Sequence, residues 1–474
     1  MSTKTVAIDH GDRKLEIEVP ATAVVAQFED PEFLADPAAA VRHALANPAG
    51  LPPLAEMARP GMRVVIGFDD ITRPANVPRT VLPIIVEVLE QAGVRERDIL
   101  FVNACSNHRK NTRTELLNHL GPELFGRFWP LGQIVNHDCY DPSGLRDFGV
   151  TDGGRVVEHN KAFFDADLQI YQGNVSAQAW KGYTGTGAVI GLASTRSIAS
   201  HHSFNSIPNT QALQQAKSKK PRPPAMKPEM SAYLEAATGR PVFYVNAVTG
   251  TQGRIVDVFA GHSGAIVGPS WALAEALFTK QVPQADVLIV GLPPAYSYGS
   301  SHNTLIASVG ALVPPRYSPN EPVLREGGVV IAVTASSGCI DPERYPSYQD
   351  TIDLYGRYHG VRPLIDHEAD FSARPEYLQR YHHGHGYPPL HPFWLFYELE
   401  YTLQRAGGVY MAGTTNPAAF RSIGVAPTAD FASAWKAARK HVGASPTVVV
   451  APTFWSRPRI KFAVEGGAAS GDAT

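Results

Sequence analysis

The stretch RVVIGFDDITRP (residues 63–74) joins a short, continuous apolar run to a strongly polar loop. An apolar run of this length is typical of a strand that is buried on both faces of a parallel sheet. A helical pattern follows from Arg79 to Ala92, and residues 98–103 (DILFVN) repeat the strand pattern. The three segments predict a strand, a helix and a second strand, which is the repeating unit of an α/β fold.

Comparable strand patterns recur along the rest of the chain. They cover residues 166–171, 242–248, 285–290, 328–334 and 408–411. Helical stretches lie between many of them, so the predicted class is α/β with largely parallel sheets. Before the first strand, alternating apolar and charged residues on either side of Gly11 predict a β-hairpin.

The domain organisation is predicted from length and composition. With 474 residues, of which 44% are hydrophobic and 18% are charged, the chain exceeds one ordinary domain and has a normal globular balance. A helix-like segment from Trp271 to Gln281 precedes the strand that begins a second α/β unit. We expect an N-terminal domain over residues 1–268 and a C-terminal α/β domain over 269–464. The tail, residues 465–474, is predicted to be disordered.

Composition also excludes several classes of protein. A formal charge of −2 without a long Lys/Arg stripe argues against nucleic-acid and membrane partners, and the basic stretch at 214–228 is typical of a solvated loop. No apolar run approaches a membrane span, and the N-terminus lacks a signal-like apolar core. Three distant cysteines argue against a disulfide framework. We expect a cytoplasmic protein whose partner is a small molecule.

Two loops that directly follow predicted strands are unusually polar. One carries Asp70, Thr72 and Arg73, and the other, residues 103–109, carries His108. Ligands bind beyond the carboxyl ends of parallel strands, so these side chains converge if the two strands are neighbours. An Arg fork suits a carboxylate or phosphate, and a His can take a proton near neutral pH. The alternative is a local ion pair between Asp70 and Arg73 that caps the next helix.

Further candidates lie in a glycine-rich loop and in groups of histidines. The loop, residues 173–187, can bring backbone N–H groups close to an anion or phosphate. His201 and His202 are of a metal-ligating type, as are the members of a later group. That group consists of His382, His383, His385 and His391. Because its segment is rich in Tyr, Pro and Phe, we prefer a packed aromatic loop there.

The order of these motifs resembles the nickel-dependent lactate racemases and related 2-hydroxyacid racemases and epimerases. The similar stretches are DITRP (70–74), NHR (107–109), VNHD (135–138), ADLQI (166–170), GYTG (182–185), GLAS (191–194), HHS (201–203), VDVFAG (256–261) and GGVVI (327–331). The resemblance implies two α/β domains with the active site in the cleft between them. It also implies a nickel-pincer nucleotide, a pyridinium mononucleotide whose sulfur-bearing arms hold nickel.

The resemblance also implies roles for individual residues. His108 matches one of the family's two catalytic bases, and His202 matches the nickel ligand. Arg73 matches a substrate contact. The implied cofactor contacts are Asp70, Thr72, Tyr183, Thr184, Gly185 and His202.

Several positions depart from the family pattern. Gln178 stands where the second His base is expected, and an amide has no useful acid-base pKa. The family tethers its cofactor to a Lys after the glycine-rich loop, whereas here Lys181 precedes that position. A substrate motif with a Gln and then a Lys aligns loosely with residues 298–303, where Ser300 and Asn303 are the polar candidates.

The leading hypothesis is a racemase or epimerase of a 2-hydroxyacid other than lactate. It would act by hydride transfer to a non-covalently held nickel-pincer nucleotide, with His108 as one base and Lys181 or His201 as the other. Two alternatives stay open: a lyase or hydrolase that uses His108 and no nickel, and a non-catalytic nucleotide- or metabolite-binding paralogue. The sequence does not determine the substrate or its stereochemistry. It also leaves open whether the protein forms a homo-oligomer.

Overall fold

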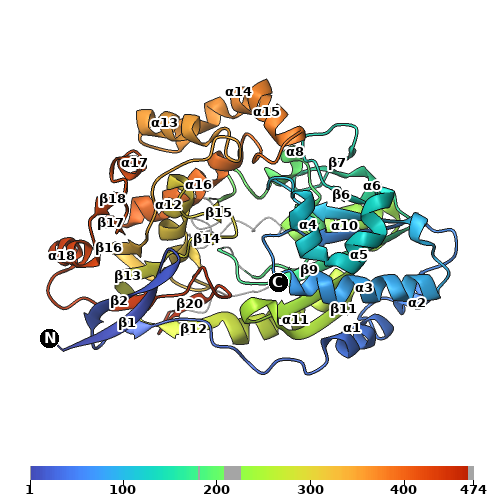
Figure 1. Ribbon diagram of the computed structural model, residues 1–474, viewed down its shortest axis with the longest axis horizontal. Helices are drawn as coiled ribbons and strands as arrows, with labels where there is room; N and C mark the ends of the chain where they lie inside the picture. The colour runs from blue at the N-terminus through green and yellow to red at the C-terminus, as the bar shows by residue number, and fades with distance from the viewer. Residues whose placement is uncertain (1, 180–181, 208–225, 468–474) are drawn as a thin grey trace.

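A computed structural model describes residues 2–179, 182–207 and 226–467, and two six-stranded sheets organise this part of the chain (Figure 1). The strand order is β11-β10-β9-β4-β5-β6 in the first sheet and β18-β17-β16-β13-β19-β3 in the second. Every neighbouring pair in these two sheets is parallel except β10 with β11. The predicted α/β class with largely parallel sheets is confirmed.

The first sheet lies in the right-hand half of Figure 1. Its strands are β4 (Val64–Asp69), β5 (Ile99–Ala104), β6 (Ile134–Asn136), β9 (Leu168–Val175), β10 (Phe243–Thr249) and β11 (Ile255–Gly261). Alternate residues of β4 pack into two different apolar clusters, Ile66 into one and Val65 into the other. A strand covered on both faces needs apolar residues at successive positions, which explains its continuous apolar run.

Helices cover both faces of this first sheet. They are α1 (Pro37–Ala46), α2 (Leu54–Met57), α3 (Asn76–Gln91), α4 (Arg113–Leu120), α5 (Pro122–Phe128), α6 (Lys161–Phe164), α7 (Ala188–Gly191), α8 (Thr195–Ile198), α10 (Met226–Thr238) and α11 (Ser263–Phe278). The helix predicted from Arg79 to Ala92 is α3. The helix predicted from Trp271 to Gln281 is α11, which begins earlier because the His262 side chain accepts a hydrogen bond from Gly264 N and caps it.

The second sheet lies in the left-hand half of Figure 1. Its strands are β3 (Val24–Val25), β13 (Ala285–Gly291), β16 (Leu324–Val333), β17 (Gly408–Ala412), β18 (Ala426–Thr428) and β19 (Val448–Ala451). The helices of this half are α12 (Thr304–Leu312), α13 (Tyr348–Tyr358), α14 (Glu368–Ala373), α15 (Pro375–His382), α16 (His391–Arg405), α17 (Ala418–Arg421) and α18 (Phe431–Val442). No helix in the described ranges is both long and apolar enough to cross a bilayer.

The first strands of the chain pack on the second sheet, and the first sheet begins only at β4. Strands β1 (Thr3–His10) and β2 (Arg13–Pro20) form the predicted hairpin, in which His10 pairs with Arg13. Its apolar face packs against residues of β13 and β16. The domain boundaries at residues 268 and 464 stay predictions, and most of the predicted tail lies outside the described residues.

Three short strand pairs complete the described fold. They are β7 (Leu145–Val150) with β8 (Val156–Asn160), β12 (Thr279–Val282) with β20 (Lys461–Val464), and β14 (Ala295–Tyr296) with β15 (Gly299–Ser300). The β12 and β20 pair joins the end of α11 to the last described strand.

Candidate functional site

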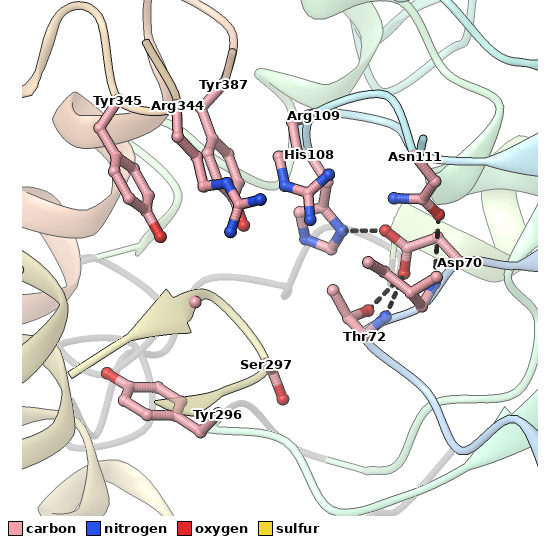
Figure 2. Close-up of a pocket in the computed structure, with 12 residues that line it drawn as sticks. Asp70, Thr72, His108, Arg109, Asn111, Tyr296, Ser297, Arg344, Tyr345 and Tyr387 are labelled. Carbon is pink, nitrogen blue, oxygen red and sulfur yellow. Dashed lines mark hydrogen bonds and ion pairs between the residues drawn. The ribbon is translucent and has the colours of Figure 1, made fainter. Parts of the chain in front are cut away.

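The loops that follow β4 and β5 meet because these strands are parallel neighbours. His108 Nδ1 lies 2.8 Å from Asp70 Oδ2, as Figure 2 shows. The other carboxylate oxygen of Asp70 accepts hydrogen bonds from the backbone N–H of Thr72, at 3.1 Å, and from the Thr72 hydroxyl. Helix α3 begins after Ala75 without a side-chain cap, so Asp70 orients His108 and does not cap this helix.

The surroundings of Asp70 keep its carboxylate ionised. Burial, the largest single effect, raises its pKa, but the charge and hydrogen bond of His108, the Thr72 hydroxyl and Arg73 outweigh burial and lower the pKa to about 2. An ionised carboxylate on Nδ1 selects the tautomer in which His108 Nε2 carries no proton. That nitrogen is then free to act as a base toward a ligand.

Asp70→Asn is expected to lower the free energy of unfolding by about 2 kcal/mol at pH 7, because a shift of one pKa unit corresponds to about 1.4 kcal/mol. The folded-state pKa lies below the ordinary value, so this stabilisation is present above about pH 4 and is lost as the pH falls toward 2. Urea unfolding should show the difference from the parent shrinking by about half at pH 3. The exposed Asp152→Asn is the control, and an equal loss in both variants would contradict the assignment.

Deeper in the same region, Asp69, Arg73 and Lys227 form a partly buried charged group. Asp69 accepts hydrogen bonds from the Tyr171 hydroxyl at 2.7 Å and from Asn174 N at 2.8 Å. Among the described residues, Arg73 Nε is buried without a hydrogen-bond partner, although Nη1 donates to Thr72 Oγ1 at 2.9 Å. Burial and the nearby charge of Arg73 lower the pKa of Lys227 to about 8.

Lys227 is a site residue that the sequence analysis missed. It belongs to the basic stretch at 214–228, which the sequence analysis interpreted as a solvated loop. From Met226 onward the chain instead forms α10, and Lys227 is partly buried. A helical pattern that begins at Met226 is the feature of the sequence that could have indicated the burial of Lys227.

His202 and His391, which come from distant segments, lie near His108, and His201 lies beside His202. Nδ1 of His201 and Nδ1 of His202 are 3.1 Å apart. The ring of His391, the first residue of α16, has its centroid 6.2 Å from that of His108, and its Nδ1 bonds the Tyr348 hydroxyl at 2.6 Å. Burial, followed by the charge of His108, lowers the pKa of His202 to about 3 and also lowers that of His391.

Two other histidines of the later group have structural partners, whereas His383 is exposed. His382 pairs with Asp138 at 2.8 Å, and His385 Nδ1 lies 3.1 Å from the carbonyl oxygen of Lys110. His391 packs against Tyr387 and Tyr348, in agreement with a packed aromatic segment. Within the described part of the chain, no group of three or more His, Cys, Asp or Glu side chains is arranged to hold a metal.

The glycine-rich loop is anchored to the rest of the protein. Gln178 Nε2 donates to the carbonyl oxygen of Tyr183 at 3.3 Å, and the Tyr183 hydroxyl donates to Glu275 of α11 at 2.5 Å. Lys461 of β20 donates to the carbonyl oxygen of Gly182 at 2.6 Å. These bonds hold Tyr183, and with it the predicted cofactor loop, against α11 and β20.

The other predicted residues of this loop have local backbone constraints or hydrogen bonds, or lie outside the described residues. Thr184 Oγ1 donates to the carbonyl oxygen of Asn174 at 2.5 Å. Gly185 has a φ of +128°, a conformation that favours glycine. Lys181 lies outside the described residues, so its proposed role stays a prediction.

A pocket of about 190 Å³ opens at the Asp70 and His108 pair (Figure 2). This space exceeds that of a single water molecule several-fold, so it has room for a small ligand. Its walls come from both halves of the chain: Asp70, Ile71, Thr72, His108, Arg109 and Asn111 from the first, and Tyr296, Ser297, Gly299, Arg344, Tyr345 and Tyr387 from the second.

The two predicted substrate residues of the second half lie beside this wall. Ser300 Oγ accepts a hydrogen bond from His302 N at 3.2 Å. Asn303 is the N-cap of α12, where its Oδ1 accepts from Leu305 N at 2.9 Å. Neither belongs to the described lining of the pocket, and their contact with a substrate stays a prediction.

Comparison with known proteins gives a match for the N-terminal part of the chain. Residues 10–214 match the lactate racemase N-terminal domain. The matched segment covers less than half of the 474-residue chain, so the match assigns this N-terminal part to the lactate racemase type. The chain is 27% identical over 252 residues to the lactate racemase of Thermoanaerobacterium thermosaccharolyticum, covering 52% of this chain and 56% of that protein. It is 29% identical over 224 residues to the lactate racemase of Lactiplantibacillus plantarum, covering 47% and 50%.

The matched segments thus span about half the length of these curated relatives. The fold is similar over nearly the whole chain to the lactate racemase apoprotein from T. thermosaccharolyticum. That comparison has a TM-score of 0.70 and 19% identity, and it covers 97% of this chain and 100% of the other. A Thermotoga maritima protein is also similar, with a TM-score of 0.54 and 14% identity, covering 86% and 96%. At these identities the two structures establish the fold alone.

The family match also separates the two walls of the pocket. Residues 70–111 lie inside the matched range of 10–214, whereas the wall formed by residues 296–299, 344–345 and 387 lies beyond it. The wall that carries Asp70 and His108 therefore lies in the matched domain, and the facing wall has to be interpreted from this chain's own residues.

Proposed function

We propose that the protein is a racemase or epimerase of a 2-hydroxyacid, and that His108 moves the proton of the substrate hydroxyl. The observation that carries the proposal is the hydrogen bond between Asp70 and His108 at the mouth of the pocket. An ionised carboxylate on Nδ1 both orients an imidazole and stabilises its protonated form, as general-base catalysis requires.

Arg73 is the proposed contact for the substrate α-carboxylate. It follows the Asp70 loop directly, and its Nε is buried without a partner among the described residues. A buried guanidinium nitrogen without an acceptor is costly, and a planar fork suits a carboxylate. Thr72, the neighbour of Arg73, lines the pocket together with His108, so we place the α-hydroxyl of a carboxylate bound to Arg73 toward His108.

The second base is proposed to be His391. Gln178 cannot transfer a proton, and its amide is bonded to the glycine-rich loop. The ring centroids of His391 and His108 lie 6.2 Å apart. The Tyr348 hydroxyl bonds Nδ1 of His391, so Nε2 is the nitrogen that would exchange a proton with a ligand. His391 comes from the part of the chain beyond the matched domain, so no local motif identifies it.

We propose that the cofactor is a nickel-pincer nucleotide held without a covalent bond. His202 is the proposed nickel ligand, because burial keeps its imidazole neutral, the form that binds metals. A single protein ligand is sufficient when the cofactor brings its own soft sulfur donors. Lys227 and Arg73 supply positive charge for an anionic nucleotide. When bound, such a cofactor would supply the acceptor for hydride from the substrate α-carbon.

The proposal is tested with protein from a host that makes the cofactor. We expect nickel at about one equivalent by elemental analysis, a released nucleotide by mass spectrometry, and a denatured intact mass equal to that of the bare chain. Chiral chromatography of 2-hydroxyacids should show inversion at the α-carbon. Elimination or hydrolysis products from nickel-free protein would contradict the proposal and favour a lyase or hydrolase on this scaffold.

A further inference from the structure

The basic side chains that line the pocket differ in whether an acid pairs with them. His108 is paired with Asp70. Arg109 uses Nη1 and Nη2 to bind Glu115, at 2.9 and 2.5 Å. Arg344 is an exposed residue that reaches the pocket lining, and within the described ranges it makes no ion pair. The positive charge of the Arg344 guanidinium is therefore not neutralised by an acid among the described residues.

The main chain around Arg344 is fixed by the surrounding structure. The carbonyl oxygen of Arg344 accepts a hydrogen bond from Tyr387 N at 2.8 Å. The rings of Tyr345 and Tyr387 stack with their centroids 5.3 Å apart and an interplanar angle of 8°. Figure 2 shows the guanidinium beside Tyr387, across the pocket from Asp70 and Thr72.

A second donor stands on the same half of the lining. Ser297 Oγ accepts a hydrogen bond from Arg459 Nη1 at 2.9 Å, so its own proton remains available for a ligand. An Arg fork and a hydroxyl donor together are well suited to a carboxylate. By contrast, the Asp70 side of the pocket carries a carboxylate whose acceptor sites are already occupied by His108 and Thr72.

We propose that Arg344 binds a second anionic group of the ligand, so that the substrate is a 2-hydroxyacid whose side chain ends in a carboxylate. This inference rests on the proposed function, in which the α-hydroxyl meets His108 and the α-carboxylate meets Arg73. The side chain of the substrate then extends across the pocket to the wall that carries Arg344. The pocket volume of about 190 Å³ restricts it to a short side chain.

Two acids with four carbon atoms test the inference: 2-hydroxysuccinate, which has the side-chain carboxylate, and 2-hydroxybutyrate, which has a methyl group in its place. Binding is measured by calorimetry and inversion by chiral chromatography, for both enantiomers, with cofactor-loaded protein. Arg344→Gln should weaken binding of 2-hydroxysuccinate by about 10- to 100-fold, the usual worth of a charged hydrogen bond. It should change binding of 2-hydroxybutyrate by less than about threefold.

Two further variants control for charge and for surface position. Arg344→Lys should recover part of the lost affinity, because an ammonium keeps the charge but not the fork. Arg380→Gln removes a nearby cation that instead pairs with Glu343 at 3.3 Å, and it should leave both affinities unchanged. An equal effect of Arg344→Gln on both acids, or no binding of 2-hydroxysuccinate by the parent, would overturn the inference.

The same measurements separate this inference from the proposed function. Inversion of 2-hydroxybutyrate without any dependence on Arg344 would leave the function standing and overturn the role of Arg344. Binding of 2-hydroxysuccinate that depends on Arg344, without inversion of either acid, would support the anion site and contradict the racemase proposal.

Discussion

His108→Gln is expected to lower turnover by about 10²- to 10⁴-fold, the usual cost of losing a general base. The His108 imidazole lines the pocket, and Asp70 holds its other nitrogen at 2.8 Å. Gln keeps an N–H donor for the buried carboxylate, so the free energy of unfolding should fall by only about 1 kcal/mol. Steady-state kinetics on a working hydroxyacid, with urea unfolding in parallel, measure both quantities.

The control for this substitution is His383→Gln, which changes an exposed histidine of the later group. It should be as active as the parent. If His108→Gln is also nearly as active as the parent, the catalytic assignment is wrong. Asp70→Asn should share most of the loss in turnover, because Asn can donate to Nδ1 and favour the wrong tautomer.

His202→Ala is expected to abolish nickel retention. This loss is the second of the two largest effects that we expect. His202 is partly buried, and its lowered pKa of about 3 keeps the imidazole in the neutral form that binds metals. Nδ1 of His201 lies 3.1 Å from Nδ1 of His202. His201 would therefore orient the His202 imidazole from the side opposite the metal. His201→Ala should therefore keep nickel but bind it about tenfold more weakly, the lower end of the effect of removing an outer contact.

Nickel is measured by elemental analysis after gel filtration, with competition by a chelator to rank affinities. Circular dichroism checks that both variants fold. If His201→Ala loses nickel and His202→Ala retains it, the ligand lies one residue earlier. If both variants retain nickel fully, the metal has ligands elsewhere in the protein.

Much of the fold could be predicted from local pattern. Every apolar run assigned to a strand forms one, because a strand buried on both faces must be apolar at successive positions. The hairpin at Gly11 was predicted from the alternation of apolar and charged residues, which reflects burial of only one of its faces. The loop residues Asp70 and His108 were also predicted, since polar residues after buried strands gather at one edge of a parallel sheet.

The partners of those residues needed the tertiary structure. The Asp70 carboxylate binds His108, 38 positions away, instead of capping α3. Lys227 was assigned to a solvated loop, yet it is partly buried near Arg73. In both cases a local pattern fitted two arrangements, and contacts between distant segments decided between them.

The sequence by itself determined the two-sheet α/β architecture and the wall of the pocket that carries Asp70 and His108, because burial periodicity and strand-end chemistry are local properties of the chain. Only the tertiary structure decided the facing wall. Arg344 and His391 come from segments more than 200 positions beyond His108, and no spacing rule connects them to it. Their place at the site depends on how the second sheet and its helices pack, which is a property of the whole fold.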